Sequence, residues 1–126
     1  VFFKNNILPD FELITIKAIQ SSAYSSINFA DFFFALDFLK NEINKKTFDI
    51  SIIGCGCYGL PLSFFIKDLK KQVIHLGGAT QILFGIKGKR WDEDINVSKF
   101  YNEHWTRPFS SEKPENFLLI EEGCYW

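Results

Sequence analysis

The clearest chemical signal in the sequence is a glycine-rich hexapeptide, Gly-Cys-Gly-Cys-Tyr-Gly, at residues 54–59. It fits the pattern G-x-G-x-x-G, follows a β-branched run at 48–53 and precedes apolar residues at helical spacing. Glycines permit a tight strand-to-helix turn, and backbone N–H groups at the start of a helix attract phosphate. We therefore expect phosphate or nucleotide contacts at Gly54, Gly56, Tyr58 and Gly59. The alternatives are a turn that only packs against its neighbours, and another kind of small ligand.

A second glycine turn follows the next apolar run. Gly77 and Gly78 come directly after residues 72–76, and a short helical pattern begins at Thr80. If the two runs form adjacent parallel strands, both turns leave the sheet at its carboxyl edge, where open α/β folds bind ligands. The candidate phosphate contacts at this turn are Gly77, Gly78, Thr80 and Gln81. The alternative role of Thr80 is a helix cap.

A basic loop comes next along the chain. Residues 84–91 contain two glycines, three cations and a tryptophan. This composition suits a loop that closes over an anion, because arginine offers phosphate a bidentate fork and lysine a point charge. We expect ligand contacts from Lys89 and Arg90, with Trp91 stacked on a base or sugar. The alternative is a solvated basic loop whose tryptophan fills the core.

Other chemistries have weaker signals. Dinucleotide-binding folds place a carboxylate at the end of the strand that follows the glycine turn, and here that position holds Ile74, His75 and Leu76. This disfavours NAD, FAD and S-adenosylmethionine, and with them an oxidoreductase, and we interpret His75 as a buried strand residue. Asp92 and Asp94 have a metal-binding spacing, but they adjoin three cations. We therefore expect no metal site and no cofactor within this chain, and we name no catalytic residue.

Apolar periodicity predicts the elements that hold these turns. Strands are expected at 11–18, 48–53, 72–76 and 117–120, and helices at 30–45, 60–71, 80–86 and 97–105. Loops are expected at 20–28, 87–96 and 108–115. Strands that alternate with crossovers of helical length predict an α/β fold. We expect one Rossmann-like, three-layer domain over residues 1–126, with a mostly parallel sheet covered by helices on both faces.

Composition limits the possible functions. Charged residues make up 23% of the chain and the net charge is -1, so we do not expect nucleic acid as a partner. No apolar segment reaches the roughly 18 residues of a membrane span. The three cysteines are too few for a disulfide scaffold, which favours reduced thiols and a cytoplasmic location. The chain has no methionine and begins Val-Phe-Phe-Lys, so we expect it to be the C-terminal portion of a longer protein.

These motifs together resemble the C-terminal part of a family of microbial proteins associated with surface-polysaccharide gene clusters. The resemblance runs from about Ile7 to the end and rests on residues 48–50, 53–62, 75–81, 83–91, 102–103, 105, 107–108 and 123–126. The family plan is similar to that of GT-D-type glycosyltransferases, which have a Rossmann-like fold. It implies that the acidic motif for a divalent metal and the sugar nucleotide lies upstream of the residues printed here.

The resulting hypothesis is that the chain forms the nucleotide-diphosphate-binding part of a sugar-nucleotide-dependent glycosyltransferase in polysaccharide biosynthesis. We expect this part to be inactive alone. Its ligand would be a nucleotide sugar or another phosphorylated small molecule. The two glycine turns would hold the diphosphate, and Lys89 and Arg90 would neutralise the leaving nucleotide. Two alternatives remain open. One is a non-enzymatic module that binds a nucleotide or a sugar phosphate, and the other is a structural domain whose glycine turns bind nothing.

Overall fold

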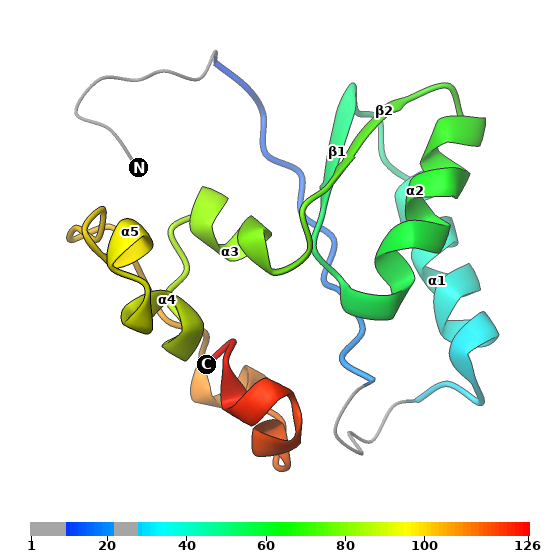
Figure 1. Ribbon diagram of the computed structural model, residues 1–126. Helices are drawn as coiled ribbons and strands as arrows, with labels where there is room; N and C mark the ends of the chain where they lie inside the picture. The colour runs from blue at the N-terminus through cyan, green and yellow to red at the C-terminus, as the bar shows by residue number, and fades with distance from the viewer. Residues whose placement is uncertain (1–9, 22–27) are drawn as a thin grey trace. The chain divides into compact units, whose positions relative to one another are not determined.

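The computed structural model describes residues 10–21 and 28–126, and these form two compact units (Figure 1). We call residues 12–20 and 28–77 the sheet unit. Residues 78–126, with the few remaining described residues, form the C-terminal unit. The expected loop at 20–28 lies mostly outside the described residues. Within the described part of the chain, no helix is long and apolar enough to cross a membrane.

The sheet unit contains two parallel strands joined by a helical crossover. β1 (Ile50–Ile53) pairs with β2 (Gln72–His75), and the register places Ile52 opposite Ile74. The connection consists of a short 3-10 helix, η1 (Gly56–Tyr58), and the helix α2 (Gly59–Asp68). The predicted strands at 48–53 and 72–76 and the helix between them are confirmed, and the fold is broadly α/β.

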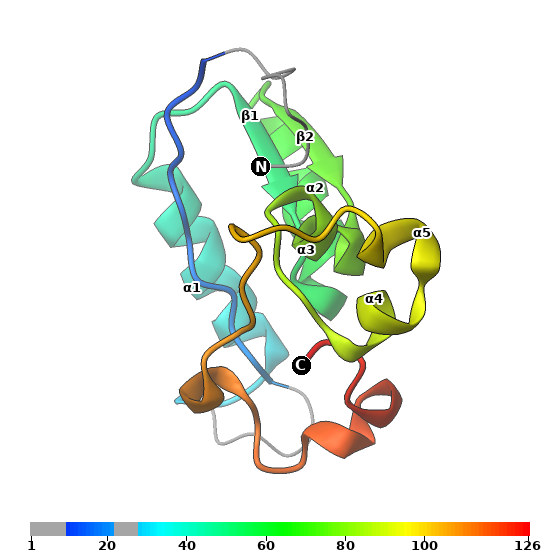
Figure 2. The same ribbon diagram turned by 90° about the vertical axis from the view of Figure 1, so that its left-hand side faces the viewer.

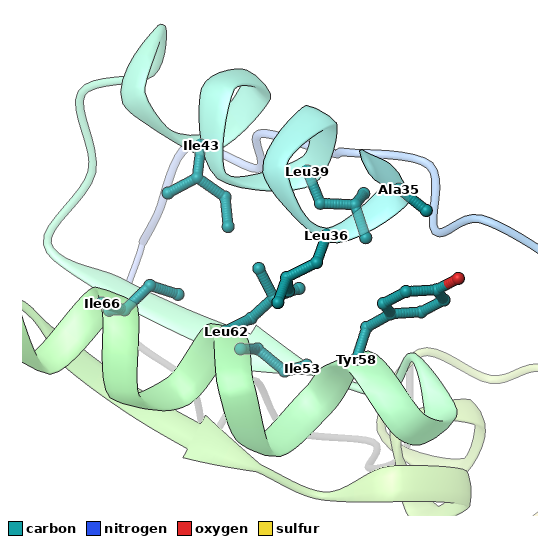
Figure 3. Close-up of a cluster of buried hydrophobic side chains, with 8 residues drawn as sticks. All are labelled: Ala35, Leu36, Leu39, Ile43, Ile53, Tyr58, Leu62 and Ile66. Atoms are coloured by element: carbon teal, nitrogen blue, oxygen red, sulfur yellow. The ribbon is translucent and has the colours of Figure 1, made fainter. Parts of the chain in front are cut away.

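The core of the sheet unit forms where α1 (Phe32–Asn44) and α2 pack together on one face of the strands (Figure 1). Apolar residues recur along α1 at helical spacing, so that one stripe of the helix is buried. Figure 3 shows this stripe facing Ile53 of β1 and the buried side chains that follow it. The cluster consists of Ala35, Leu36, Leu39, Ile43, Ile53, Tyr58, Leu62 and Ile66.

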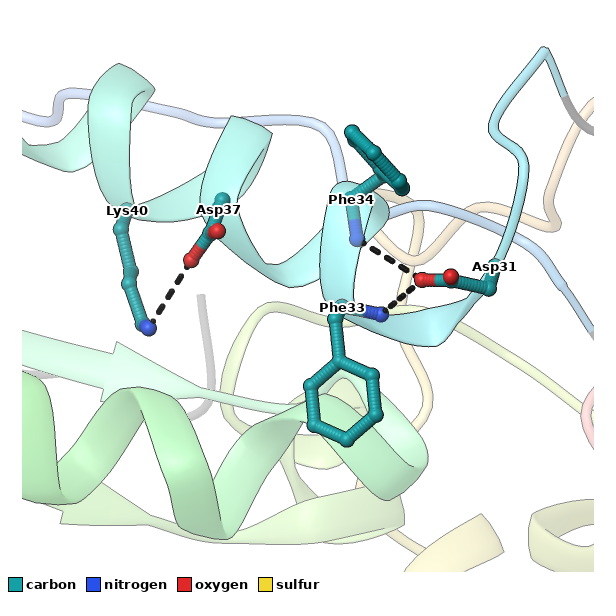
Figure 4. A network of polar contacts seen from close by, with 5 residues as sticks. All are labelled: Asp31, Phe33, Phe34, Asp37 and Lys40. Atoms are coloured by element: carbon teal, nitrogen blue, oxygen red, sulfur yellow. Dashed lines mark hydrogen bonds and ion pairs between the residues drawn. The ribbon is translucent and has the colours of Figure 1, made fainter.

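The first turn of α1 is capped by Asp31. Its carboxylate oxygen Oδ1 accepts hydrogen bonds from the backbone N–H groups of Phe33, at 2.7 Å, and Phe34, at 3.1 Å (Figure 4). These amides have no partner within the helix, so the cap satisfies donors that would otherwise depend on water.

We expect Asp31→Ala to lower the free energy of unfolding by about 1 kcal/mol, because it removes both acceptor contacts. Asp37→Ala on the same helix is the matched control, since it breaks only the exposed 3.0 Å pair with Lys40 (Figure 4). We expect that control to cost about 0.5 kcal/mol or less. Urea unfolding followed by circular dichroism measures both, and equal losses would contradict a specific role for the cap.

The C-terminal unit is built from short helical segments. They are α3 (Thr80–Leu83), α4 (Lys89–Glu93) and α5 (Ile95–Ser98), followed by the 3-10 helices η3 (Ser110–Glu112), η4 (Phe117–Leu119) and η5 (Glu121–Gly123). A further 3-10 turn, η2 (Gly77–Ala79), leads from β2 into this unit. Within this unit an isolated parallel β-bridge joins Ile86 and Thr106. The Lys87 N–H donates to the Thr106 oxygen there at 2.7 Å.

Several predicted elements were wrong. Residues 11–18 form no strand, because among the described residues this segment has no strand partner. Instead, residues 12–20 run extended along α1 (Figure 2), where Thr15 to Lys17 line a shallow hollow with Phe38, Glu42 and Lys46. Residues 117–120 form a 3-10 turn and not a strand. The expected loop at 87–96 contains α4 and the start of α5, and the helix expected at 97–105 begins earlier and ends at Ser98.

The two faces of the sheet differ in their cover. Ile53 and Val73 point toward α2 and the core, whereas Ile50, Ile52 and Ile74 alternate to the opposite face. These three isoleucines are exposed in the described part of the structure. Within the described part of the sheet unit, the structure therefore has a two-strand parallel sheet with α1 and α2 packed on one of its faces.

Candidate functional site

The two glycine turns leave the sheet at the same edge. β1 and β2 are parallel neighbours, and the Leu76 N–H closes their pairing by donating to the Ile53 oxygen at 2.9 Å. Gly56 and Gly77 follow the two strand ends with φ angles of +53° and +56°. This left-handed conformation favours glycine, and a side chain added at either position would meet no other atom within 4 Å. Both turns thus present bare backbone toward open space at the carboxyl edge.

Gly59 packs against the histidine at the end of β2. It is buried at the start of α2, and the imidazole of His75 lies directly against its Cα, in the space that a side chain would need. His75 itself is exposed at the end of β2, so the interpretation of this histidine as a buried strand residue was wrong. The absence of a side chain at the third glycine of the motif therefore leaves room for a histidine beside the turn. The sequence showed both residues but could not show that they meet.

Tyr58, another predicted ligand contact, belongs to the core of the sheet unit. Only 2% of its surface is exposed, and its ring stacks on that of Phe32 with the centroids 4.9 Å apart and the planes within 5°. Figure 3 shows the ring among the aliphatic residues of α1 and α2. This packing anchors the turn to α1.

The Cys55 thiol, next to Gly56, is not activated as a nucleophile. Burial, and to a smaller extent the neighbouring Cys57, raises the pKa of Cys55 to about 11. The Cys55 thiol is therefore protonated at neutral pH, and a thiol in that state is a poor nucleophile and metal ligand. Cys57 is exposed on the same turn, and all three cysteines are free. The described residues contain no group of three or more potential metal ligands.

Most of the remaining predicted contacts lie in the C-terminal unit, around Arg90. Gly78 faces the Arg90 guanidinium and the Tyr125 ring, both of which would crowd a side chain at that position. The indole N–H of Trp91 donates to the side-chain oxygen of Gln81 at 2.9 Å. The Gln81 amide nitrogen in turn donates to the Tyr125 backbone oxygen at 3.0 Å. We call Gly78, Gln81, Arg90, Trp91 and Tyr125 the Arg90 cluster.

Aromatic rings and one carboxylate surround the charge of Arg90. The guanidinium carbon lies 4.9 Å from the ring centroid of Tyr125 and 5.6 Å from that of Trp91, within the range of a cation–π contact. The guanidinium also forms an ion pair with Glu121. Burial opposes the charge, but the nearby Cys124, Tyr125 and Glu121 outweigh it and raise the pKa of Arg90 above its ordinary value. Arg90 is thus a fixed and partly enclosed cation.

The other two predicted residues of this unit lie at helix starts. Thr80 is the first residue of α3 and Lys89 the first residue of α4. The Lys89 ammonium is exposed, 3.9 Å from a carboxylate oxygen of Glu122. Gly54 is exposed at the end of β1, at the edge where Gly56 and Gly77 lie.

A second polar cluster in the C-terminal unit went unpredicted. Asp92 accepts a hydrogen bond from the Tyr101 hydroxyl at 3.0 Å and pairs with Arg107 at 2.6 Å. Burial and this bond to Asp92 raise the pKa of Tyr101 to about 12. Asp92 therefore links α4 to the later residues Tyr101 and Arg107. No local pattern could reveal it, because its partners lie nine and fifteen residues further along the chain.

The structure thus gathers the predicted residues into two groups. Gly54, Gly56, Gly59 and Gly77 lie around the carboxyl edge of the sheet unit, and Gly78, Gln81, Arg90 and Trp91 form one cluster in the C-terminal unit. The prediction missed Tyr125, which completes that cluster, and Glu121, which forms an ion pair with Arg90. No known family model matches the sequence, and no curated protein and no solved structure matches the chain.

Proposed function

We propose that this chain binds the diphosphate of a nucleotide sugar and forms the nucleotide-binding part of a glycosyltransferase that acts in polysaccharide biosynthesis. The observation that carries the proposal is the pair of left-handed glycine turns, at Gly56 and Gly77, on adjacent parallel strands. Open α/β sheets bind their ligands in this position, outside the carboxyl ends of the strands. Two neighbouring turns offer backbone N–H groups to two linked phosphates.

The chemistry of sugar transfer gives the cations their roles. When a sugar leaves a nucleotide diphosphate, negative charge grows on the departing phosphate, and fixed positive charge lowers the energy of that state. Arg90 provides a planar donor fork and Lys89 a mobile ammonium. In this proposal His75, whose imidazole packs against Gly59 at the start of α2, lies beside the phosphates held at the turns.

The finer fold assignment belongs to the same proposal. A parallel sheet is normally covered on both faces, and its strands are apolar on both sides. Ile50, Ile52 and Ile74 give the exposed face of this sheet the same apolar character as the covered one. A Rossmann-like, three-layer organisation would cover these isoleucines with a further layer of helix.

The test is isothermal titration of the protein with UDP- and GDP-sugars, in the presence of Mg²⁺ or Mn²⁺. We expect binding, and we expect Gly56→Ala to weaken it about tenfold, because alanine disfavours a positive φ and its methyl group occupies the phosphate's approach. Leu60→Ala is the matched control. Its side chain is 60% exposed, one residue beyond the turn, so that variant should bind as the original protein does.

The possible outcomes separate the proposal from its rivals. Failure to bind any nucleotide or nucleotide sugar would contradict the proposal and leave a structural domain. Tight binding that Gly56→Ala does not change would place the ligand away from the turns. Binding without sugar transfer to any acceptor would identify a non-enzymatic module.

A further inference from the structure

The Arg90 cluster already holds an anion, and that anion comes from the chain itself. Glu121 forms an ion pair with the Arg90 guanidinium, while the ring of Tyr125 lies against the same cation. The carboxylate of Glu121 also accepts from the Cys124 thiol at 3.5 Å. A carboxylate presents two oxygens to the guanidinium fork much as a phosphate does. Glu121 therefore stands where the anionic part of a ligand would bind.

Backbone contacts seat the same segment on the start of α4. The Arg90 N–H donates to the Cys124 oxygen at 3.0 Å, and the Lys89 N–H donates to the Trp126 oxygen at 3.2 Å. Gly88 makes this approach possible, because a side chain there would press on the backbone of residues 124 and 125 at about 3.0 Å. The segment thus occupies main-chain donors as well as the guanidinium.

The seated segment is held in a costly conformation. Glu121 and Glu122 have φ angles of +44° and +55°, and Gly123 follows at +78°. Only glycine adopts this region readily, so two of these three residues are strained. The contacts with Arg90 and with α4 must offset that strain. A ligand that binds Arg90 in place of Glu121 removes part of this compensation and so favours release of residues 121–126.

We infer that residues 121–126 form a latch in which Glu121 acts as an internal competitor for the anion site at Arg90. The inference rests on the proposed function, since it requires Arg90 to receive the anionic part of the ligand. The Glu121–Arg90 pair is partly exposed, so solvent weakens it. A diphosphate has more charge and more acceptor oxygens than one carboxylate. Such a ligand displaces the latch, and the latch excludes weaker monovalent anions.

The experiment compares the affinity of inorganic pyrophosphate and of UDP for four proteins. They are the original chain, Glu121→Gln, Glu122→Gln and the double variant Arg90→Ala with Glu121→Gln. We expect Glu121→Gln to bind about fivefold more tightly, because the competitor has lost its charge. Glu122→Gln is the matched control, since that side chain lies 3.9 Å from Lys89 and is almost fully exposed. Glu122→Gln should change the affinity less than twofold. The double variant should lose the tighter binding that Glu121→Gln alone produces.

Hydrogen exchange gives a second readout. The amides of Lys89 and Arg90 donate to the latch, so saturating pyrophosphate should speed their exchange, although ligands usually slow exchange near their site. Equal affinities for the original chain and Glu121→Gln would overturn the latch and leave the proposed function standing. Slower exchange at both amides would also overturn it. Failure of all four proteins to bind either probe would overturn the proposed function and the latch together.

Discussion

Replacing Ile66 by alanine is expected to lower the free energy of unfolding by about 2–5 kcal/mol, the largest effect we predict in the sheet unit. Ile66 is completely buried, on the face of α2 that meets α1 (Figure 3). The substitution removes apolar area from the core and leaves a cavity that α1, α2 and β1 can close only in part.

The matched control is Phe64→Ala on the same helix. Phe64 is larger than Ile66, but 67% of its surface is exposed. Its loss should change stability by no more than about 0.5 kcal/mol. Urea unfolding followed by circular dichroism measures both variants. If Phe64→Ala proved as costly as Ile66→Ala, the apolar face of α2 would have been assigned to the wrong side.

Trp105→Ala is expected to cost about 3–5 kcal/mol in the C-terminal unit. Only 5% of Trp105 is exposed, and its ring lies 4.7 Å from that of Tyr101. Trp105 directly precedes Thr106, whose backbone pairs with Gly85 and Lys87. The ring therefore supports the only bridge among the described residues that joins the two halves of this unit.

Hydrogen exchange at the amides of Lys87 and Thr106 measures this effect directly, because both amides donate within the bridge. Trp105→Ala should speed their exchange strongly. Trp105→Phe keeps an aromatic ring against Tyr101 and should restore part of the protection. Protection that survives the alanine substitution would show that the bridge does not depend on this ring.

The sequence predicted the elements whose information is local. The stripe along α1, the runs at β1 and β2 and the glycines after them follow from short-range periodicity and backbone preference. These suffice for the parallel pair and for both turns at one edge. The strand predicted at 11–18 failed because its β-forming residues need a partner strand, which composition alone cannot supply.

The Arg90 cluster could not be predicted in full, because it depends on contacts between residues far apart in the sequence. Arg90 and Trp91 stand out in the sequence, but Glu121 lies 31 residues beyond Arg90, and the Tyr125 backbone lies 44 residues beyond Gln81. Contacts over such separations are set by tertiary packing. The same holds for Tyr58, whose position in the glycine motif hid its role in the core.

The division into two units has an optical consequence. Trp91, Trp105 and Trp126 are the only tryptophans of the sequence, and all three lie in the C-terminal unit. The two longest helices, α1 and α2, lie in the sheet unit. Tryptophan fluorescence therefore reports on one unit, while the helical ellipticity reports mainly on the other. One denaturant titration read in both channels compares the two units without any label, and superimposed curves would identify a single cooperative transition.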